Sequence, residues 1–184
     1  MKDNYDISAL KKKKKVNSRA KGSTFERQIA KILNDRLGTT EFSRTPGSGA
    51  FATTHSLPDH LKIYGDLITP QNFKYCLECK KGYNNQNLYS LYNHSSDFWK
   101  FIEQCQKDSE KCGKIPMVIF KQDRQPTLAI IPSHIVVESN NYIEIHKESQ
   151  YYRIYMFDDL LREDDSVTKI SPESIEALNM LGKE

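Results

Sequence analysis

The stretch GDLITPQNFKYCLECKK, residues 65–81, places charged residues inside apolar, strand-forming runs. Asp66 precedes one short apolar run, and Glu78 and Lys80 lie two residues apart in the next run. Because successive side chains of a strand point to opposite faces, Glu78 and Lys80 share one face. Burying unpaired charges costs on the order of several kcal/mol each. The segment therefore predicts a site that uses these charges.

The position of Asp66 depends on the turn between the two runs. Leu61–Ile68 and Phe73–Lys80 are expected to form an antiparallel hairpin. With a three-residue loop, Asp66 lies opposite Cys76 and diagonal to Glu78, on the same face. A two-residue loop without a bulge turns Asp66 to the other face. The predicted site therefore requires an odd-membered turn or a bulge.

An amphipathic helix is expected upstream, beginning at Ser23 as the N-cap and ending at Gly38. Glu26 lies three residues before Ile29 and seven before Leu33, which places it on or beside the apolar face. A first-turn glutamate that stabilises the helix dipole or a cap is an equally good interpretation of Glu26. The apolar stripe comprises Phe25, Ile29, Ile32, Leu33 and Leu37.

The loop SRTPGSG, residues 43–49, follows this helix. Arg44 and Ser48 can donate hydrogen bonds to phosphate, and Gly47 and Gly49 allow backbone amides to approach closely. A glycine-rich loop is also typical of ordinary turns, so this motif is weak by itself.

The remaining patterns predict an α-β-β-α-β-β core with an appended hairpin and helix, an α/β (α+β) fold. One domain is expected at 184 residues, with a core at 21–135 and a C-terminal extension at 136–184. The expected elements are a helix at Asp97–Lys111, strands at Ile115–Lys121 and Thr127–Ile131, a hairpin of Tyr142–His146 and Tyr151–Phe157, and a helix at Ser171–Leu181.

Charge is unevenly distributed along the chain, although the net charge is only +3. Residues 1–24 carry eight Lys and Arg against two Asp, and residues 157–184 carry eight acids against three basic residues. Residues 1–20 are therefore expected to be a flexible basic arm that contacts a polyanion, or a tail that only aids solubility. The sequence has no long apolar run and no secretory signal, so a cytoplasmic protein is expected.

Cys76 and Cys79 form a C-x-x-C pair, the spacing of many zinc sites. Positions three apart on a strand point to opposite faces, so these two thiols cannot bind one ion together. Cys105 and Cys112 have no ligand spacing relative to them. Reduced, mostly buried thiols are therefore expected.

Three carboxylates that converge repel one another unless a cation lies between them. Hard oxygen ligands favour Mg²⁺, which keeps several waters, and Mn²⁺ is expected to substitute. Asp66, Glu78 and the carbonyl of Cys79 are the expected ligands, and Glu26 binds directly or through water. Lys80 is expected to orient or help deprotonate the attacking water and to offset negative charge.

These motifs resemble the PD-(D/E)XK nuclease superfamily, and most closely its Holliday junction resolvase branch from archaea and phages. The resemblance covers roughly residues 20–135. The familiar proline before the aspartate is replaced here by Gly65, and the segment between Gly49 and Asp66 is longer than in compact members. The matching segments are Lys21–Arg27, Ser43–Gly49, Gly65–Asp66, Leu77–Lys81 and Ile115–Lys121.

The resemblance implies a restriction-endonuclease-like mixed sheet flanked by helices and magnesium-dependent hydrolysis of DNA. It also implies a homodimer that cuts four-way junctions or other branched DNA in recombination, repair or phage DNA processing. The alternatives are another nuclease of the superfamily (flap, restriction-like or exonuclease) and a non-catalytic DNA-binding protein. The implied catalytic residues are Glu26, Asp66, Glu78 and Lys80, and the implied DNA contacts are Arg44, Ser48, Gly47, Lys21, Arg27 and Lys81.

Overall fold

The computed structural model describes residues 18–46, 64–137 and 139–163. The described residues form a five-stranded mixed sheet in the order β3-β4-β5-β7-β6, together with a separate two-stranded pair, β1 and β2. Only β3 and β4 are parallel; every other neighbouring pair is antiparallel. The elements are α1 (Ser18–Leu37), β1 (Ser43–Arg44), β2 (Leu67–Ile68), β3 (Tyr75–Lys81), α3 (Leu88–Tyr92), α4 (Asp97–Cys112), β4 (Ile115–Lys121), β5 (Thr127–Pro132), β6 (Tyr142–Lys147), β7 (Gln150–Met156) and α5 (Phe157–Glu163).

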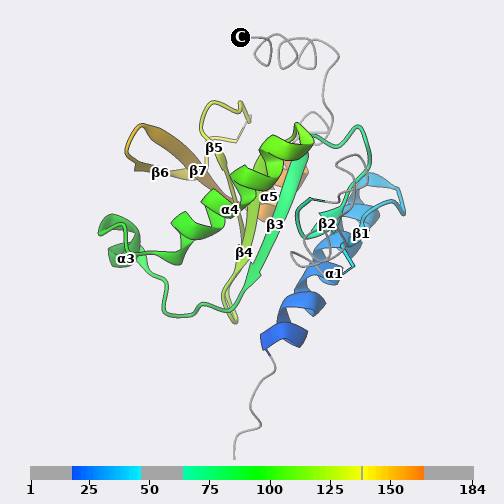
Figure 1. Ribbon diagram of the computed structural model, residues 1–184, viewed down its shortest axis with the longest axis horizontal. Helices are drawn as coiled ribbons and strands as arrows, with labels where there is room; N and C mark the ends of the chain where they lie inside the picture. Colours follow the sequence, from blue (N-terminus) through cyan, green and yellow to red (C-terminus); the bar gives the residue numbers. More distant parts are fainter. Residues whose placement is uncertain (1–17, 47–63, 138, 164–184) are drawn as a thin grey trace, which may run out of the picture.

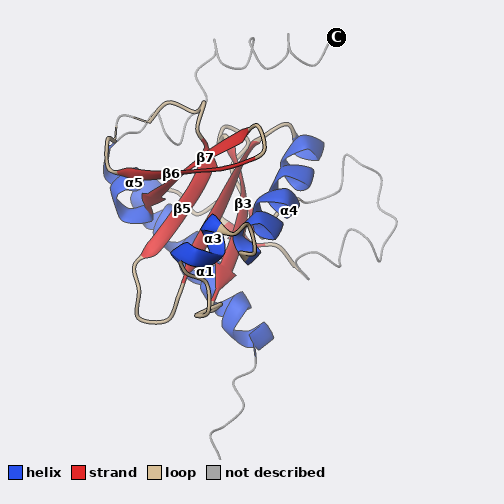
Figure 2. Ribbon diagram, turned by 90° about the vertical axis from the view of Figure 1, so that its left-hand side faces the viewer, coloured by secondary structure: helices blue, strands red, loops and turns tan. Residues whose placement is uncertain are grey.

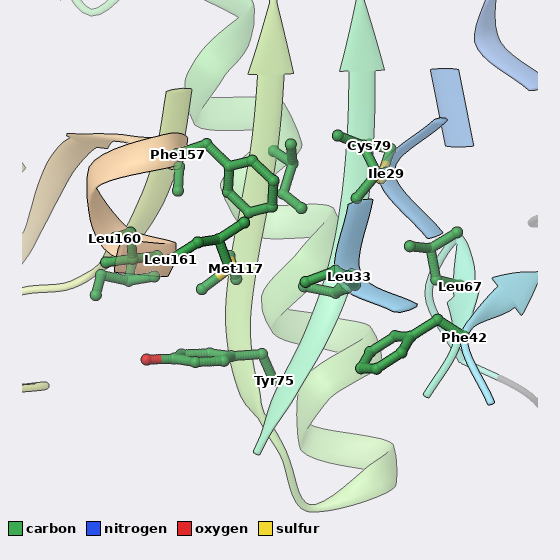
Figure 3. Packing of buried hydrophobic residues seen from close by; sticks show 14 of the residues in the cluster. Ile29, Leu33, Phe42, Leu67, Tyr75, Cys79, Met117, Phe157, Leu160 and Leu161 are labelled. Atoms are coloured by element: carbon green, nitrogen blue, oxygen red, sulfur yellow. The ribbon is translucent and has the colours of Figure 1, made fainter. Parts of the chain in front are cut away.

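Helices cover both faces of this sheet (Figures 1 and 2). On one face, α4 packs against apolar residues of β4, β5 and β7, such as Phe120 and Ile154. On the other face, α1 and α5 contribute residues such as Leu33 and Leu160, which pack with Met117 of β4 (Figure 3). The structure confirms the expected mixed central sheet flanked by helices. No helix in the described part of the chain is long and apolar enough to span a bilayer.

The hairpin of β6 and β7 is present, but it is part of the central sheet. β7 pairs with β5 as well as with β6, so the hairpin extends the sheet to five strands. The expected bounds of β4 are confirmed, and α4 extends one residue beyond its expected end, to Cys112, where Gly113 adopts a left-handed conformation. The helix expected at Ser171–Leu181 lies outside the described residues.

Helix α1 begins at Ser18, not at Ser23. The expected N-cap at Ser23 is therefore wrong, because its hydroxyl instead donates to the carbonyl of Ala20 within the helix. Gly38 ends the helix as expected, with a left-handed φ of 62° and a hydrogen bond from Thr39 N to Asn34 O. Residues 18–20, expected in the basic arm, are helical, and residues 1–17 lie outside the described part of the chain.

The expected hairpin between Leu61–Ile68 and Phe73–Lys80 is wrong. Strand β2 covers only Leu67–Ile68, and it pairs with β1 instead of β3. The physical reason lies next to Asp66, whose carbonyl accepts a hydrogen bond from Thr45 N while its own amide donates to Leu77 O at 2.8 Å. The chain therefore touches the edge of β3 at Asp66 and then pairs with β1.

Gly65 makes this close approach possible. Its φ is +76°, and a Cβ at this position would lie 2.8 Å from Leu77 O and 3.0 Å from the Cys76 sulfur. A side chain here would clash with the backbone of Leu77, and the left-handed conformation would add a further energetic cost. A glycine at this position, where the superfamily that the sequence resembles usually has proline, thus has a local structural cause.

We expect Gly65→Ala to lower the free energy of unfolding by about 3 kcal/mol or more, because steric overlap adds to the backbone cost. The matched control is Gly38→Ala, which has a left-handed φ of +62° and open space around its Cβ position. That control should lose only about 1 kcal/mol. Urea unfolding followed by Trp99 fluorescence measures both values, and equal losses would contradict the proposed overlap.

Candidate active site

Four of the predicted residues line one cleft of about 650 Å³ between α1 and the open edge of β3. Glu26, Asp66, Glu78 and Lys80 all contribute to its wall, although they come from three separate segments of the chain. Strand β3 is at the edge of the sheet, so its outer side is available to the segment around Asp66. The fold brings together the charges that the sequence predicts to meet.

Glu26 lies on the third turn of α1 and is only 6% exposed. Because the helix begins at Ser18, the first-turn interpretation of Glu26 does not apply. Its Oε2 accepts a hydrogen bond from Nε of Arg44, which follows on β1. An inward glutamate that is paired with an arginine can position other charges without being left unpaired itself.

Asp66 is buried and linked to β3 through its side chain. Its Oδ2 accepts a hydrogen bond from the backbone N–H of Cys79 at 2.8 Å. Burial raises the pKa of Asp66 to about 6, and nearby Glu26 adds to the rise, while the Cys79 bond and Lys80 oppose it. A carboxyl with this pKa is still largely ionised at neutral pH, but it ionises less readily than an ordinary aspartate.

Glu78 is 1% exposed and lies in the middle of β3. Burial and the negative charge of Asp66 together raise the pKa of its carboxyl to about 7, although Lys80 opposes the rise. The ammonium of Lys80 pairs with its Oε1, which confirms that these two residues, two apart on β3, share a face. Asp66 and Glu78 thus form a buried acid pair that a cation in the cleft would stabilise.

Lys80 keeps its positive charge in this setting. Burial alone lowers the pKa of its ammonium, but the adjacent Glu78 carboxylate outweighs that effect, and the pKa is raised. Its Nζ also donates to Oε1 of Gln104 on α4 at 3.4 Å and lies 5.4 Å from the centre of the Phe101 ring. A protonated lysine fits the role of offsetting negative charge better than that of a general base.

The donor chemistry of the cleft fits a hard divalent cation. Magnesium binds through one or two carboxylates and keeps its other positions for water. Asp66 and Glu78 supply such a set, and Cys79, whose N–H bonds to Asp66, adds a backbone carbonyl oxygen beside Glu78. Within residues 18–46, 64–137 and 139–163, no group of three Asp, Glu, His or Cys is arranged to hold an ion. Glu26, which pairs with Arg44, therefore fits an indirect role through water.

The predicted DNA-contacting residues are placed differently from one another. Lys81 lines the cleft, with its ammonium 5.5 Å from the centre of the Phe25 ring. Lys21 also lines the cleft, and it forms an ion pair of 2.7 Å with Asp123. Arg27 is exposed on α1 and is not among the residues that line the cleft. Gly47 and Ser48 lie outside the described residues.

Several residues in the cleft or bonded to it carry no signal in the sequence. Asp123, in the turn between β4 and β5, accepts hydrogen bonds from Lys21 and from Nδ2 of Asn84. Gln104 reaches Lys80 from α4. These contacts join segments that are far apart in the chain and follow no motif spacing, so only the fold identifies them. The Arg44–Glu26 pair was also missed, because the sequence assigned Arg44 to DNA alone.

The cysteines are free thiols. The Cys76 thiol faces α4, where it is within hydrogen-bond distance of the thiols of Cys105 and Cys112. Cys79 packs with α1 on the other side of the sheet. The prediction that the C-x-x-C pair faces two ways is confirmed.

The raised pKa values of Asp66 and Glu78 predict a pH-dependent stability in a chelating buffer. In the unfolded chain the pKa values of Asp66 and Glu78 are near their ordinary values of 3.8 and 4.5. In the folded chain these pKa values are about 6 and about 7. Between these limits the folded chain holds more protons than the unfolded chain, so ionisation destabilises the fold and stability falls as pH rises from about 4 to about 7. Glu78→Gln should remove much of this fall.

Thermal unfolding from pH 4 to pH 8 measures this effect for the wild type and for Glu78→Gln. Other carboxylates change both curves alike, so the informative quantity is the difference in Tm between the two proteins. The wild type should lose Tm relative to the variant as pH rises. Two parallel curves would show that Glu78 is not destabilised by its surroundings.

A mixed sheet whose edge strand carries E-x-K, beside a buried aspartate and a helical glutamate, is the arrangement expected of a PD-(D/E)XK nuclease. The family described as "Phage putative PDDEXK endonuclease" matches residues 17–179. The chain is also 35% identical over 153 residues to Protein D14 of Escherichia phage T5, covering 78% of this chain and 91% of that protein. The chain therefore belongs to this phage PDDEXK endonuclease family, whose superfamily generally uses divalent metals. No solved structure matches it.

Proposed function

We propose that this protein is a divalent-metal-dependent endonuclease that hydrolyses phosphodiester bonds in branched DNA, with Mg²⁺ as its ion. The observation that carries the proposal is the buried acid pair of Asp66 and Glu78, which shares one cleft with Lys80 and Glu26. Family membership supports nuclease chemistry on DNA. The branched substrate rests on the resemblance to junction resolvases.

In this mechanism Asp66, Glu78 and the Cys79 carbonyl would hold the ion, and Glu26 would act through water. A bound Mg²⁺ supplies Lewis-acid polarisation of the phosphate and lowers the pKa of a water molecule. The chain's own residues position the reactants: the N–H of Cys79 fixes the Asp66 carboxylate, and Arg44 fixes Glu26. Lys80 donates hydrogen bonds and offsets charge that develops on the phosphoryl oxygens.

Lys81 and Lys21 at the cleft are proposed to contact DNA phosphates. Such contacts give affinity that falls with salt and carry no sequence information. Shape would then select the substrate, and a two-fold homodimer would place two clefts on symmetrically related strands of a four-way junction. Because Lys21 pairs with Asp123, DNA has to compete with that carboxylate for the ammonium.

The test is cleavage of a panel of end-labelled DNAs with Mg²⁺ or Mn²⁺, with the nicks mapped. The panel holds a four-way junction, a flap, a splayed duplex, a linear duplex and a single strand. We expect paired nicks near the branch point of the junction and no cleavage in chelator. Cutting of the flap or the linear duplex instead would assign another nuclease activity of the same superfamily, and intact DNA throughout would contradict the proposal.

A further inference from the structure

The segment between β3 and α4, residues 82–96, contains no Asp, Glu, Lys or Arg, yet it follows Lys80 and Lys81 directly. It carries three exposed tyrosines: Tyr83 is 42% exposed, Tyr89 is 80% exposed and Tyr92 is 85% exposed. Figure 1 shows this segment leaving the end of β3 and reaching α3, which lies on the opposite side of β3 from α1. An uncharged run of exposed aromatic residues thus leads away from the cleft.

Polar contacts that do not use the tyrosine rings hold the backbone of this segment. Gly82 N donates to Lys121 O at 2.9 Å, and Nε2 of Gln122 donates to the carbonyls of Tyr83 and Gln86. The side chain of Gln86 accepts hydrogen bonds from the Ser96 hydroxyl and from Asp97 N. The fold therefore orders the segment without burying its aromatic rings.

Helix α3 is fixed in the same way. Asn87 and Ser90 form a reciprocal capping box at its start, and Leu91 packs against the core on the α4 side of the sheet. Tyr89 and Tyr92 belong to neither core cluster. Two large rings that are held on an ordered helix but left in solvent are typical of a contact surface, because exposed apolar area has no stabilising role in the free chain.

Tyr83 lies on the same chain segment, at the end next to the cleft. It lines the cleft, and its ring meets the edge of Phe101 with the centroids 4.8 Å apart. Its backbone is left-handed, with a φ of 53°, an unusual conformation for a bulky residue. Such a conformation persists where surrounding contacts enforce it. One of these contacts is the hydrogen bond that Nε2 of Gln122 donates to the Tyr83 carbonyl.

We propose that Tyr83, Tyr89 and Tyr92 form a stacking surface for the unpaired bases of a single strand that leaves the cleft. Tyrosine rings stack on any base, and an uncharged surface neither repels nor strongly attracts the phosphates between them. The lysines of the cleft supply the charge, and the tyrosines supply the contact with bases. This inference rests on the proposed nuclease function and adds that the preferred branched DNA carries a single-stranded segment.

Continuity with the cleft favours a nucleic acid over a protein as the occupant. The segment begins at Tyr83, a cleft residue, and carries no charged side chain, while the exposed amide of Asn85 can bond to base edges and sugars. A second copy of the chain is the competing occupant, and it gives a different result in the test below.

The test measures DNA binding in chelator, where no cleavage is expected. A labelled oligothymidylate of about 15 nucleotides, enough for a single-strand site of ordinary size, is compared with a duplex of equal length by fluorescence anisotropy. The pair Tyr89→Ala and Tyr92→Ala should weaken single-strand binding by about tenfold for each ring. Duplex binding should change by less than about threefold, since it depends on phosphate contacts.

Two controls separate stacking from other effects. Tyr89→Phe with Tyr92→Phe keeps the rings and should retain single-strand affinity. Tyr151→Ala removes a half-exposed tyrosine on β7, away from the cleft, and should also retain it. Wild-type affinity in the alanine pair, or an equal loss for single strand and duplex, would overturn the inference.

Sedimentation velocity on the same variants distinguishes the competing occupant. If the alanine pair dissociates a dimer while DNA affinity stays at the wild-type value, the surface is an interface between two copies and the stacking inference is wrong. Because none of these measurements uses cleavage or bound metal, they stand apart from the metal-site proposal, which is tested by cleavage assays and by metal binding.

Discussion

Asp66→Asn is expected to reduce DNA cleavage by at least about a thousandfold while leaving DNA affinity within about threefold of wild type. The change removes the negative charge of a proposed metal ligand. The asparagine side-chain carbonyl can still accept the hydrogen bond that Asp66 takes from Cys79 N at 2.8 Å, so the local fold should persist. Single-turnover cleavage of branched DNA and anisotropy binding in chelator measure the two quantities separately.

The matched control for Asp66→Asn is Glu103→Gln. Glu103 is an exposed carboxylate on α4 that pairs with Lys147 at 3.2 Å, outside the cleft. Its neutralisation should change neither cleavage nor binding, which separates a loss of local charge from a general electrostatic effect. Full cleavage by the Asp66 variant would rule out the proposed site.

Lys80→Ala is expected to lower the turnover rate by about a hundredfold to ten-thousandfold, with metal affinity nearly unchanged. The ammonium pairs with Glu78 inside the cleft, where partial burial strengthens its attraction to a bound phosphate. It is not a proposed metal ligand. Metal affinity is measured by calorimetric titration of Mn²⁺, and turnover by single-turnover cleavage at saturating metal.

Lys81→Ala is the neighbouring control on the same strand. Lys81 follows Lys80 on β3, so its side chain points the other way, over Phe25 of α1. Its loss should weaken binding and reduce the salt slope by about one, with little effect on the rate at saturation. If both lysine variants showed the same small loss of affinity and no loss of rate, Lys80 would be a DNA contact instead of a catalytic residue.

The sequence predicts the site well where local periodicity decides the geometry. The two-residue period of β3 is enough to place Glu78 and Lys80 on one face, and it separates Cys76 from Cys79. The spacing of Glu26 relative to Ile29 and Leu33 indicates the buried side of α1, but only the helix start at Ser18 excludes the first-turn interpretation. The apolar run at Ile115–Lys121 gives the bounds of β4 without error.

Prediction from the sequence fails where contacts between distant segments of the chain determine the position of a site residue. The expected position of Asp66 depends on a hairpin loop, but β2 pairs with β1 and that hairpin is absent. Instead, the hydrogen bonds from Asp66 N to Leu77 O and from Cys79 N to Asp66 Oδ2 hold the carboxylate beside β3. No local pattern signals that Gly65 must pass within van der Waals distance of Leu77 O. The Arg44–Glu26 pair likewise joins β1 to α1 across the cleft. These features follow from how segments pack, which periodicity does not report.

The most direct test of the metal centre is an anomalous diffraction map from crystals of the protein soaked in Mn²⁺. Our account predicts a peak bonded to carboxylate oxygens of Asp66 and Glu78 and to the main-chain oxygen of Cys79, with Lys80 nearby but unbound. A cleft without a peak, or manganese bound only to surface carboxylates such as Asp123, would contradict it.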